Sequence, residues 1–243
     1  MELDTWLMWR GLVGDTHPIR KYNCSHHFIS REQTSKILSS LRPFFIPAWL
    51  LTKNLMWRVL KLKKKFVWGI TGSGDEIEKI LDYMSHFKES HPDIDIRVYL
   101  SKSAEQVLTW YKLLDSIKTS YKVKTETSPN TPFLAGEVQS GKYDFMLVAP
   151  TTSNSTTKIA LGIGDTLITN AVNMAVKANV PVYLFPCEAG EEEKVTILPN
   201  GEELRLTIRE IDAKYIEMLE KDPGIHVLRN INEIKQTLHK YYS

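Results

Sequence analysis

The fold is decided by the stretch Tyr143-Asp144-Phe145-Met146-Leu147-Val148-Ala149-Pro150-Thr151-Thr152-Ser153-Asn154-Ser155-Thr156-Thr157-Lys158. Its first half is an almost uninterrupted apolar run, which is typical of a strand buried on both faces of a sheet. Its second half, residues 149–158, holds seven hydroxyl or amide side chains in ten positions. A helix cap needs only one or two such residues. The excess indicates a loop that binds a polar but uncharged ligand.

Strand and helix patterns alternate on both sides of this stretch. Apolar residues recur at helical spacing from Ile77 to Phe87, directly after a short apolar strand. The predicted strands cover 66–70, 95–100, 143–149, 180–185 and 225–228, and the predicted helices cover 77–87, 104–117, 155–161, 165–178, 212–220 and 231–241. Asn200-Gly201 between two β-rich segments, 194–198 and 203–208, predicts a hairpin. The alternation predicts an α/β fold with a doubly wound, mainly parallel sheet in three layers, Rossmann-like or flavodoxin-like.

The composition changes near residue 65, and we expect two parts. Residues 65–243 form the α/β domain, and residues 1–64 form an N-terminal extension of unknown role. The extension holds four of the six tryptophans and the His26-His27 pair, with helical patterns at 33–41 and 50–62. The second pattern has apolar and basic faces, which would suit a membrane surface or a partner. An unstructured extension and a start codon assigned too early remain alternatives, so we assign the extension no function.

Charge and cysteine content exclude several classes of protein. The net charge of +2 gives no argument for nucleic acid. The lysine run at Lys61, Lys63, Lys64 and Lys65 marks either an anionic partner or a solvated linker. The only two cysteines, Cys24 and Cys187, exclude a disulfide framework and a four-cysteine metal or iron–sulfur cluster within one chain. We expect no metal site, and electron transfer would require an organic cofactor or a cluster on a partner.

Nothing in the sequence predicts a leader or a membrane span. The first fourteen residues lack a continuous apolar core. The longest apolar stretch, 44–51, is interrupted by Pro47 and is far shorter than the roughly 20 residues that span a bilayer. We expect a cytoplasmic protein.

A glycine-rich turn follows the first predicted strand, with the sequence GITGSG at 69–74. Glycines before a helix let backbone N–H groups approach a phosphate, and Ser73 adds a donor. The turn fits neither the Walker A pattern nor G-x-G-x-x-G. By itself it indicates either a phosphate site or a tight structural turn. Ser101 ends the second strand at the same sheet edge, where it faces the ligand or caps a helix.

Three motifs in order carry a resemblance to a known family. They are GITGSG at 69–74, LSKSA at 100–104, and VAPTTSNS at 148–155 followed by KIALGIGDTLITNA at 158–171. Together they resemble the homo-oligomeric flavoprotein family, over about residues 65–230. Within that family, WGITGSGD at 68–75, WYKL at 110–113 and PFLAG at 132–136 are most similar to archaeoflavoprotein and the proteins related to dihydromethanopterin reductase.

The resemblance implies a bound flavin mononucleotide (FMN), a flavoprotein fold and a homo-oligomer. By resemblance, Gly72, Ser73 and Gly74 hold the phosphate, and Ser101 contacts the phosphate or ribityl side. Cys187 either contacts the flavin or is a buried, inert cysteine. Asp165 and Thr169 are expected to cap or to pack between subunits. The loop residues implied to line the ribityl chain and ring are Thr152, Ser153, Asn154 and Ser155.

The same resemblance narrows the chemistry. The decarboxylases of the family use a histidine just before the central strand, and residues 132–143 contain none. Prenyl transfer is harder to exclude, since Glu188 has a counterpart in the flavin prenyltransferases, but Cys187 replaces an expected arginine. Redox chemistry remains. The resemblance implies that electrons come from ferredoxin or a similar iron–sulfur donor and pass to a small-molecule acceptor such as dihydromethanopterin. The lysine-rich face is the expected docking surface for the donor. A flavin carrier without its own substrate stays open as the alternative.

Overall fold

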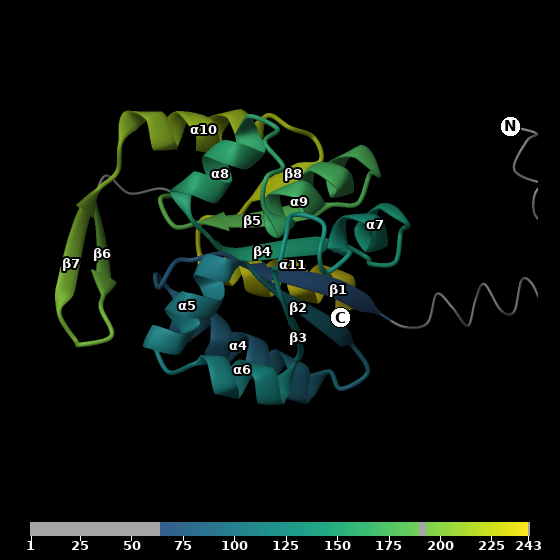
Figure 1. Ribbon diagram of the computed structural model, residues 1–243, viewed down its shortest axis with the longest axis horizontal. Helices are drawn as coiled ribbons and strands as arrows, with labels where there is room; N and C mark the ends of the chain where they lie inside the picture. The colour runs from purple at the N-terminus through teal and green to yellow at the C-terminus, as the bar shows by residue number, and fades with distance from the viewer. Residues whose placement is uncertain (1–63, 190–192, 243) are drawn as a thin grey trace, which may run out of the picture. The chain divides into compact units, whose positions relative to one another are not determined.

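Six parallel strands form the central sheet, in the order β3-β2-β1-β4-β5-β8 (Figure 1). This is the order of a doubly wound, Rossmann-type sheet, in which the direction of winding reverses between β1 and β4. The structure, a computed structural model, describes residues 64–189 and 193–242. The strands are β1 (Lys65–Ile70), β2 (Asp95–Leu100), β3 (Lys122–Thr125), β4 (Met146–Thr151), β5 (Val182–Pro186) and β8 (Ile225–Val227).

Helices cover both faces of the sheet (Figure 1). One face packs against α4 (Ile77–Ser90), α5 (Lys102–Trp110), α6 (Leu114–Ser120) and α11 (Ile231–Tyr242). The opposite face packs against α7 (Leu134–Gln139), α8 (Ser153–Ala160), α9 (Leu167–Lys177) and α10 (Glu210–Glu220). The predicted three-layer α/β fold is therefore confirmed. No described helix is long and apolar enough to cross a membrane.

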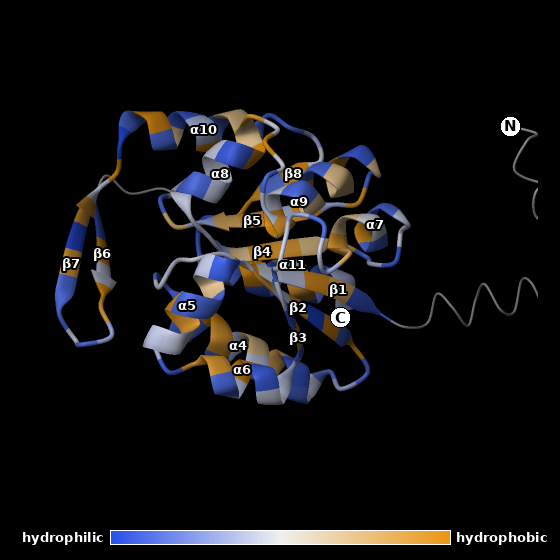
Figure 2. Ribbon diagram, viewed as in Figure 1, coloured by the Kyte–Doolittle hydropathy of each residue, from blue (hydrophilic) through white to orange (hydrophobic). Residues whose placement is uncertain are grey.

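The sheet has a hydrophobic core on each face, and successive side chains of a strand point into one core and then the other. In β1, Phe66 and Trp68 belong to the core on the α4 side, whereas Val67 belongs to the core on the α9 side. Figure 2 shows β4 and β5 as largely hydrophobic ribbons, as expected for central parallel strands. Gly69 lets α9 approach closely, because a Cβ there would lie 3.1 Å from Cδ1 of Ile168.

The predicted hairpin is present as β6 (Glu193–Ile197) and β7 (Glu203–Thr207). Gly201 in its turn has a φ of 86°, a conformation that favours glycine. The hairpin lies beside the main sheet (Figure 1). Two of its polar contacts with the described part of the domain involve Tyr111 and Asp75. The Tyr111 hydroxyl donates to the Ile197 carbonyl over 2.8 Å, and Lys194 pairs with Asp75 over 3.2 Å.

The prediction of one helix over 104–117 is wrong. The chain forms α5 and α6 there, separated by Lys112, which has a φ of 58°. The amide of Leu113 donates back to the Leu108 carbonyl over 2.8 Å and closes the turn. Strand β3 and helix α7 were not predicted. Both are short, and β3 is an edge strand with two exposed lysines, so neither gives a strong apolar pattern.

The other predicted elements are present with shifted ends. The segments at 155–161 and 165–178 are α8 and α9, and the helix at 212–220 is α10, which begins two residues earlier. Helix α9 starts with a capping box between Thr166 and Thr169, and Asp165 pairs with Lys158 over 2.8 Å. The expected capping role of Thr169 is therefore confirmed. Cys24, Lys61, Lys63 and the predicted helices at 33–41 and 50–62 lie outside the described residues.

Candidate functional site

The candidate site lies at the carboxyl ends of β1 and β4, where the strand order reverses. Ligands of doubly wound sheets bind in the crevice outside this switch point. Three loops meet there: residues 71–76 after β1, the start of α8 after β4, and residues 187–189 after β5. Ser101, after β2, lies on the same edge, because Ser101 N–H donates to the Ile70 carbonyl over 3.0 Å.

Thr71 joins the first two loops. Its hydroxyl donates to the Pro150 carbonyl over 3.0 Å and accepts from the Thr152 amide over 2.8 Å. The side chain is buried, and the Thr71 amide also donates to Pro150. Thr71 was not singled out from the sequence. The sequence feature that could have identified Thr71 is its position, directly after the last residue of the buried strand β1.

The third loop is joined to the first by Cys187. Its thiol donates to the Ser73 hydroxyl over 2.9 Å, and its amide donates to the Thr151 carbonyl over 3.0 Å. Burial raises the pKa of this thiol well above its usual range, so it stays protonated at neutral pH. Cys187 therefore holds the loops together as a neutral donor, with none of the thiolate character of a reactive cysteine.

The glycines of the turn at 69–74 have a packing role. A Cβ on Gly72 would lie 2.5 Å from Cβ of Ser103 in α5, and a Cβ on Gly74 would lie 2.3 Å from the Tyr111 hydroxyl. The turn is thus pressed against α5. No hydrogen bond among the described residues uses the N–H of Gly72 or Gly74. Both groups therefore remain able to donate to a ligand. The turn can bind a phosphate and, at the same time, be required for close packing against α5.

The turn does not lead directly into a helix. Helix α4 begins at Ile77, after Glu76, which has a φ of 54°. Asp75 is buried and pairs with Lys194 of the hairpin. Burial raises the pKa of Asp75, although the attraction of Lys194 opposes this shift. Two carboxylates thus stand between the turn and α4, and each is paired with a lysine, Asp75 with Lys194 and Glu76 with Lys79 over 2.8 Å.

The hydroxyl-rich loop forms the first turn of α8. Thr152 is the N-cap, and its hydroxyl accepts from the Ser155 amide over 3.3 Å and donates to the Ser155 hydroxyl over 3.1 Å. Asn154 is exposed. The first amides of the helix, those of Ser153 and Asn154, have no intrahelical acceptor. This helix start therefore presents both side-chain and backbone donors to the crevice.

Glu188 is a second residue that the sequence reasoning left unassigned. The Ser153 hydroxyl donates to Glu188 Oε1 over 2.5 Å. Oε2 of Glu188 is buried and has no hydrogen-bond partner among the described residues. Burial raises the pKa of this carboxyl. The Ser153 bond and the backbone amide of Glu188 itself oppose that shift, and Asp212 and Asp75 add to it. The sequence feature that points to Glu188 as a site residue is its position two residues after the end of the buried strand β5.

Ser101 has the role of a helix cap. Its hydroxyl accepts from the Ala104 amide over 3.0 Å at the start of α5. This leaves the hydroxyl proton of Ser101 available to a ligand. The structure thus brings the predicted residues to one edge of the sheet: Gly72, Ser73, Gly74, Ser101, Thr152, Ser153, Asn154, Ser155 and Cys187. None of the described residues forms a group of three or more side chains suited to a metal ion.

A doubly wound sheet with a polar, hydroxyl-rich edge at its switch point defines a nucleotide-binding α/β protein. The chain belongs to the Flavoprotein family, whose model matches residues 58–240. This match confirms the resemblance drawn from the three motifs.

Individual relatives agree with the family. An uncharacterized protein of Methanocaldococcus jannaschii, MJ0730, is 43% identical over 178 residues, which cover 73% of this chain and 95% of that protein. A dihydromethanopterin reductase (acceptor) of Methanosarcina mazei is 34% identical over 134 residues. The match covers 51% of this chain and 55% of the reductase, so the chain spans about half the length of that relative.

A solved structure shares the fold. The crystal structure of Burkholderia xenovorans DmrB in complex with FMN, described as a cubic protein cage for redox transfer, has a TM-score of 0.64 and 28% sequence identity. The similarity covers 74% of this chain and 96% of that chain. Two structures described as FMN-dependent decarboxylases, a UbiX-like enzyme from Escherichia coli and TvaF, share the fold at 16% and 20% identity with TM-scores of 0.53 and 0.51. Similarity at this level shows the fold alone.

Proposed function

We propose that this protein is an FMN-dependent oxidoreductase that takes electrons from an external donor and passes them to a small-molecule acceptor. The observation that carries the proposal is the convergence of neutral donors at the β1–β4 switch point in a chain of the Flavoprotein family. DmrB, a structural relative that contains FMN, supports the choice of cofactor.

The residues present fit FMN. The free amides of Gly72 and Gly74, with the Ser73 and Ser101 hydroxyls, are donors of the kind that hold a phosphate. The first turn of α8 supplies neutral donors for a ribityl chain and a flavin ring. Glu188 Oε2, a buried oxygen without a partner among the described residues, requires a polar atom that a ligand would provide.

The cofactor supplies the electron chemistry, and the protein supplies binding and orientation. No nucleophile is needed at the site, which agrees with the protonated, buried thiol of Cys187. Thr71 fixes the distance between the turn and α8, and the Cys187–Ser73 bond fixes the third loop. The named relative indicates dihydromethanopterin as the acceptor to test.

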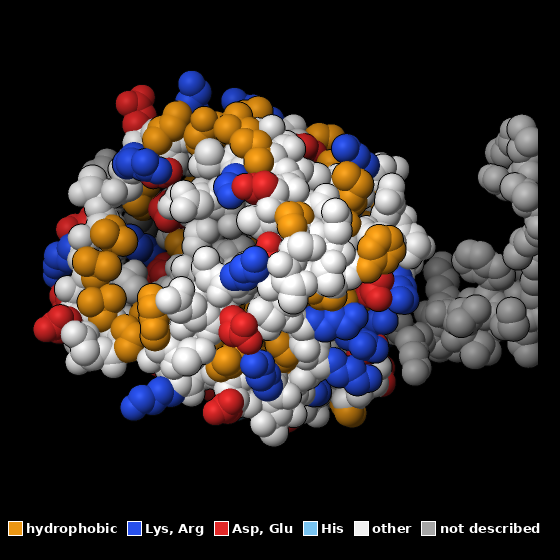
Figure 3. Space-filling model, viewed as in Figure 1, with side chains coloured by type: hydrophobic (Ala, Val, Ile, Leu, Met, Phe, Trp, Pro, Cys, Tyr) orange, Lys and Arg blue, Asp and Glu red, His pale blue; other side chains and the backbone are white. Residues whose placement is uncertain are grey.

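The donor that we propose is a ferredoxin or a similar iron–sulfur protein, because the two cysteines of the chain cannot form a cluster. The described lysines nearest the basic run at 61–65 do not lie beside the candidate site. Lys65, Lys122 and Lys142 lie at the amino ends of β1, β3 and β4, and Figure 3 shows basic side chains gathered on that side. A strand of six residues separates them from the candidate site by about 20 Å. The predicted lysine-rich docking face therefore stays a prediction.

We also propose a homo-oligomer. Apolar side chains of the hairpin and of α10 are exposed: Val195, Ile197, Leu204, Leu206, Ile211 and Met218. Figure 3 shows a group of apolar side chains on that side of the molecule. A two-stranded ribbon is marginal in water unless something covers it. The cubic cage described for DmrB supports assembly from copies of one chain.

The test begins with the purified protein. We expect a yellow protein whose released cofactor is FMN. After anaerobic reduction, rapid reoxidation by dihydromethanopterin would support the reductase. Reoxidation only by other proteins would instead support a flavin carrier without its own substrate. A colourless protein that does not take up added FMN would contradict the proposal.

A further inference from the structure

The loop after β5 carries a carboxyl group, that of Glu188, whose protonation state decides what it can offer the ligand. Glu188 accepts a hydrogen bond from Ser153 through Oε1, while Oε2 is buried without a partner among the described residues. An ionised carboxylate is an acceptor with two oxygens, and a buried, unpaired oxygen of that kind is costly. The neutral carboxylic acid fits the observed contacts better than the ionised form does. Its Oε1 accepts the bond from Ser153, and its Oε2–H can donate to a ligand.

Charge balance around Glu188 favours the neutral form. The charged groups that face it come from three other elements. Asp75, in the turn after β1, is paired with Lys194 of β6 over 3.2 Å. Asp212 of α10 is paired with Arg209 over 2.7 Å. Cys187 beside it is a neutral thiol. The two cations already face other carboxylates, so ionisation of Glu188 would add a third negative charge to this cluster.

We propose that Glu188 is held as a neutral carboxylic acid whose Oε2–H donates a hydrogen bond to an acceptor atom of the bound FMN. The inference rests on the proposed function for the identity of the ligand. A hydrogen bond of this kind makes the affinity for FMN depend on pH. When Glu188 loses its proton, the donor becomes an acceptor and the bond to the cofactor is lost.

The protonation state can be measured without any cofactor. In the FMN-free protein, the infrared spectrum should show a carboxylic acid C=O band at neutral pH that Glu188→Gln removes. The matched control, Glu193→Gln, changes an exposed carboxylate on β6 and should keep the band. A spectrum without this band at neutral pH would overturn the inference and leave the proposed function untouched.

The ligand bond is tested through FMN affinity, measured by fluorescence quenching from about pH 5 to about pH 9. As Glu188 ionises, the dissociation constant should rise about tenfold, the factor that corresponds to losing one hydrogen bond of about 1.4 kcal/mol. Glu188→Gln, which cannot ionise, should show no such rise, and Glu193→Gln should match the unmodified protein. Equal pH dependence with and without Glu188 would overturn the inference.

A second variant keeps the test decisive if Glu188→Gln fails to fold. The Ser153 hydroxyl bond favours the ionised form of Glu188 and so lowers its pKa. Ser153→Ala should therefore move the weakening of FMN binding to higher pH, whatever its effect on absolute affinity. A shift to lower pH, or none, would count against Glu188 as the titrating group. Failure of FMN to bind at every pH would instead defeat the proposed function.

Discussion

The thiol of Cys187 donates a 2.9 Å hydrogen bond to the hydroxyl of Ser73, although the two residues are 114 positions apart in the chain. This bond joins the glycine-rich turn after β1 to the loop after β5 across the polar edge of the sheet. It gives the buried Cys187 a structural role at the candidate site, as a hydrogen-bond donor whose thiol is protonated.

The first prediction concerns the reactivity of Cys187. In a Cys24→Ser background, a thiol reagent should modify folded protein roughly 100-fold more slowly than unfolded protein, because the thiol is buried and protonated. The measurement is the labelling rate with and without denaturant. Cys187→Ser should retain FMN binding, since a hydroxyl can donate the same bond. Fast labelling of the folded protein would contradict the assigned role.

The second prediction concerns the contact of the turn with α5. Gly72→Ala should destabilise the protein by about 1–3 kcal/mol and weaken FMN binding, because the new Cβ would overlap Cβ of Ser103. Thermal unfolding and FMN titration measure the two effects. The double variant Gly72→Ala with Ser103→Gly removes the main clash and should recover part of the stability. If it recovers none, the contact with Ser103 is not the constraint.

The third prediction concerns Thr71. Thr71→Val keeps the shape of the side chain but removes both bonds of its hydroxyl, leaving the Thr152 amide without its acceptor. We expect a loss of about 1–3 kcal/mol in the free energy of unfolding and weaker FMN binding. Thr71→Ser keeps the hydroxyl and should bind FMN nearly as well as the original protein. Equal behaviour of the two variants would show that the hydroxyl is unimportant.

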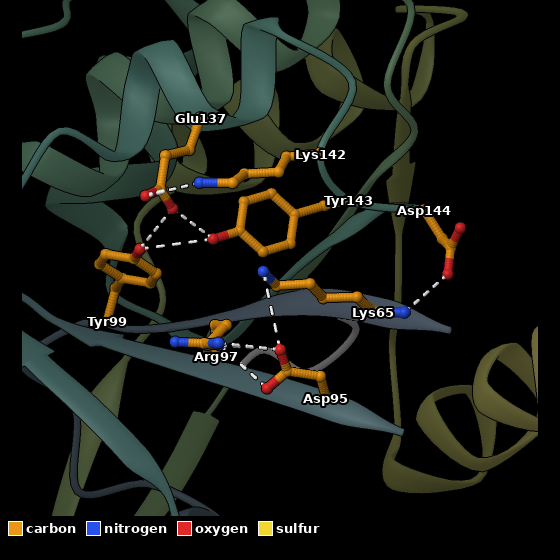
Figure 4. A network of polar contacts seen from close by, with 8 residues as sticks. All are labelled: Lys65, Asp95, Arg97, Tyr99, Glu137, Lys142, Tyr143 and Asp144. Carbon is orange, nitrogen blue, oxygen red and sulfur yellow. Dashed lines mark hydrogen bonds and ion pairs between the residues drawn. The ribbon is translucent and has the colours of Figure 1, made fainter. Parts of the chain in front are cut away.

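The fourth prediction concerns a network at the opposite end of the sheet (Figure 4). Glu137 of α7 accepts hydrogen bonds from Tyr99, Tyr143 and Lys142. Burial raises the pKa of Glu137, but these bonds outweigh burial and lower it from 4.5 to about 2. The network thus ties α7 to β2 and to the segment that precedes β4.

Because the folded pKa of Glu137 is lowered, its contribution to stability is present above the unfolded pKa and is lost as the pH falls toward 2. The loss should be at most on the order of 3 kcal/mol, since part of the side chain meets solvent. Chemical denaturation at several pH values measures it. Glu137→Gln should flatten the acid limb between pH 4.5 and about 2, and an unchanged limb would contradict this assignment.

Elements with a clear local pattern could be predicted from the sequence, and elements that depend on distant contacts or on an unmarked break could not. The central strand β4 and the hairpin around Asn200-Gly201 have patterns that tertiary packing does not override. The break at Lys112 could not be foreseen, because no glycine marks its positive φ. Edge strand β3 owes its existence to pairing with β2, a contact that local sequence does not reveal.

Part of the candidate site could be proposed from residue composition alone, and part depends on contacts between residues far apart in the chain. The hydroxyl-rich loop at 152–155 is visible in the sequence by composition alone. The importance of Thr71 and Glu188 depends on partners 81 and 35 residues away, respectively. The need for a glycine at position 72 also depends on a distant residue, because Ser103 approaches it only when α5 packs against the turn.

The reversal of strand order between β1 and β4 also has a consequence for how the protein is made. β1 pairs on one side with β2 and on the other with β4, about 80 residues later in the chain. A nascent chain that ends before β4 would contain the turn and Ser101 but none of the α8 donors. The candidate site can therefore assemble only after synthesis passes β5, and uptake of FMN would report that both halves of the sheet have joined.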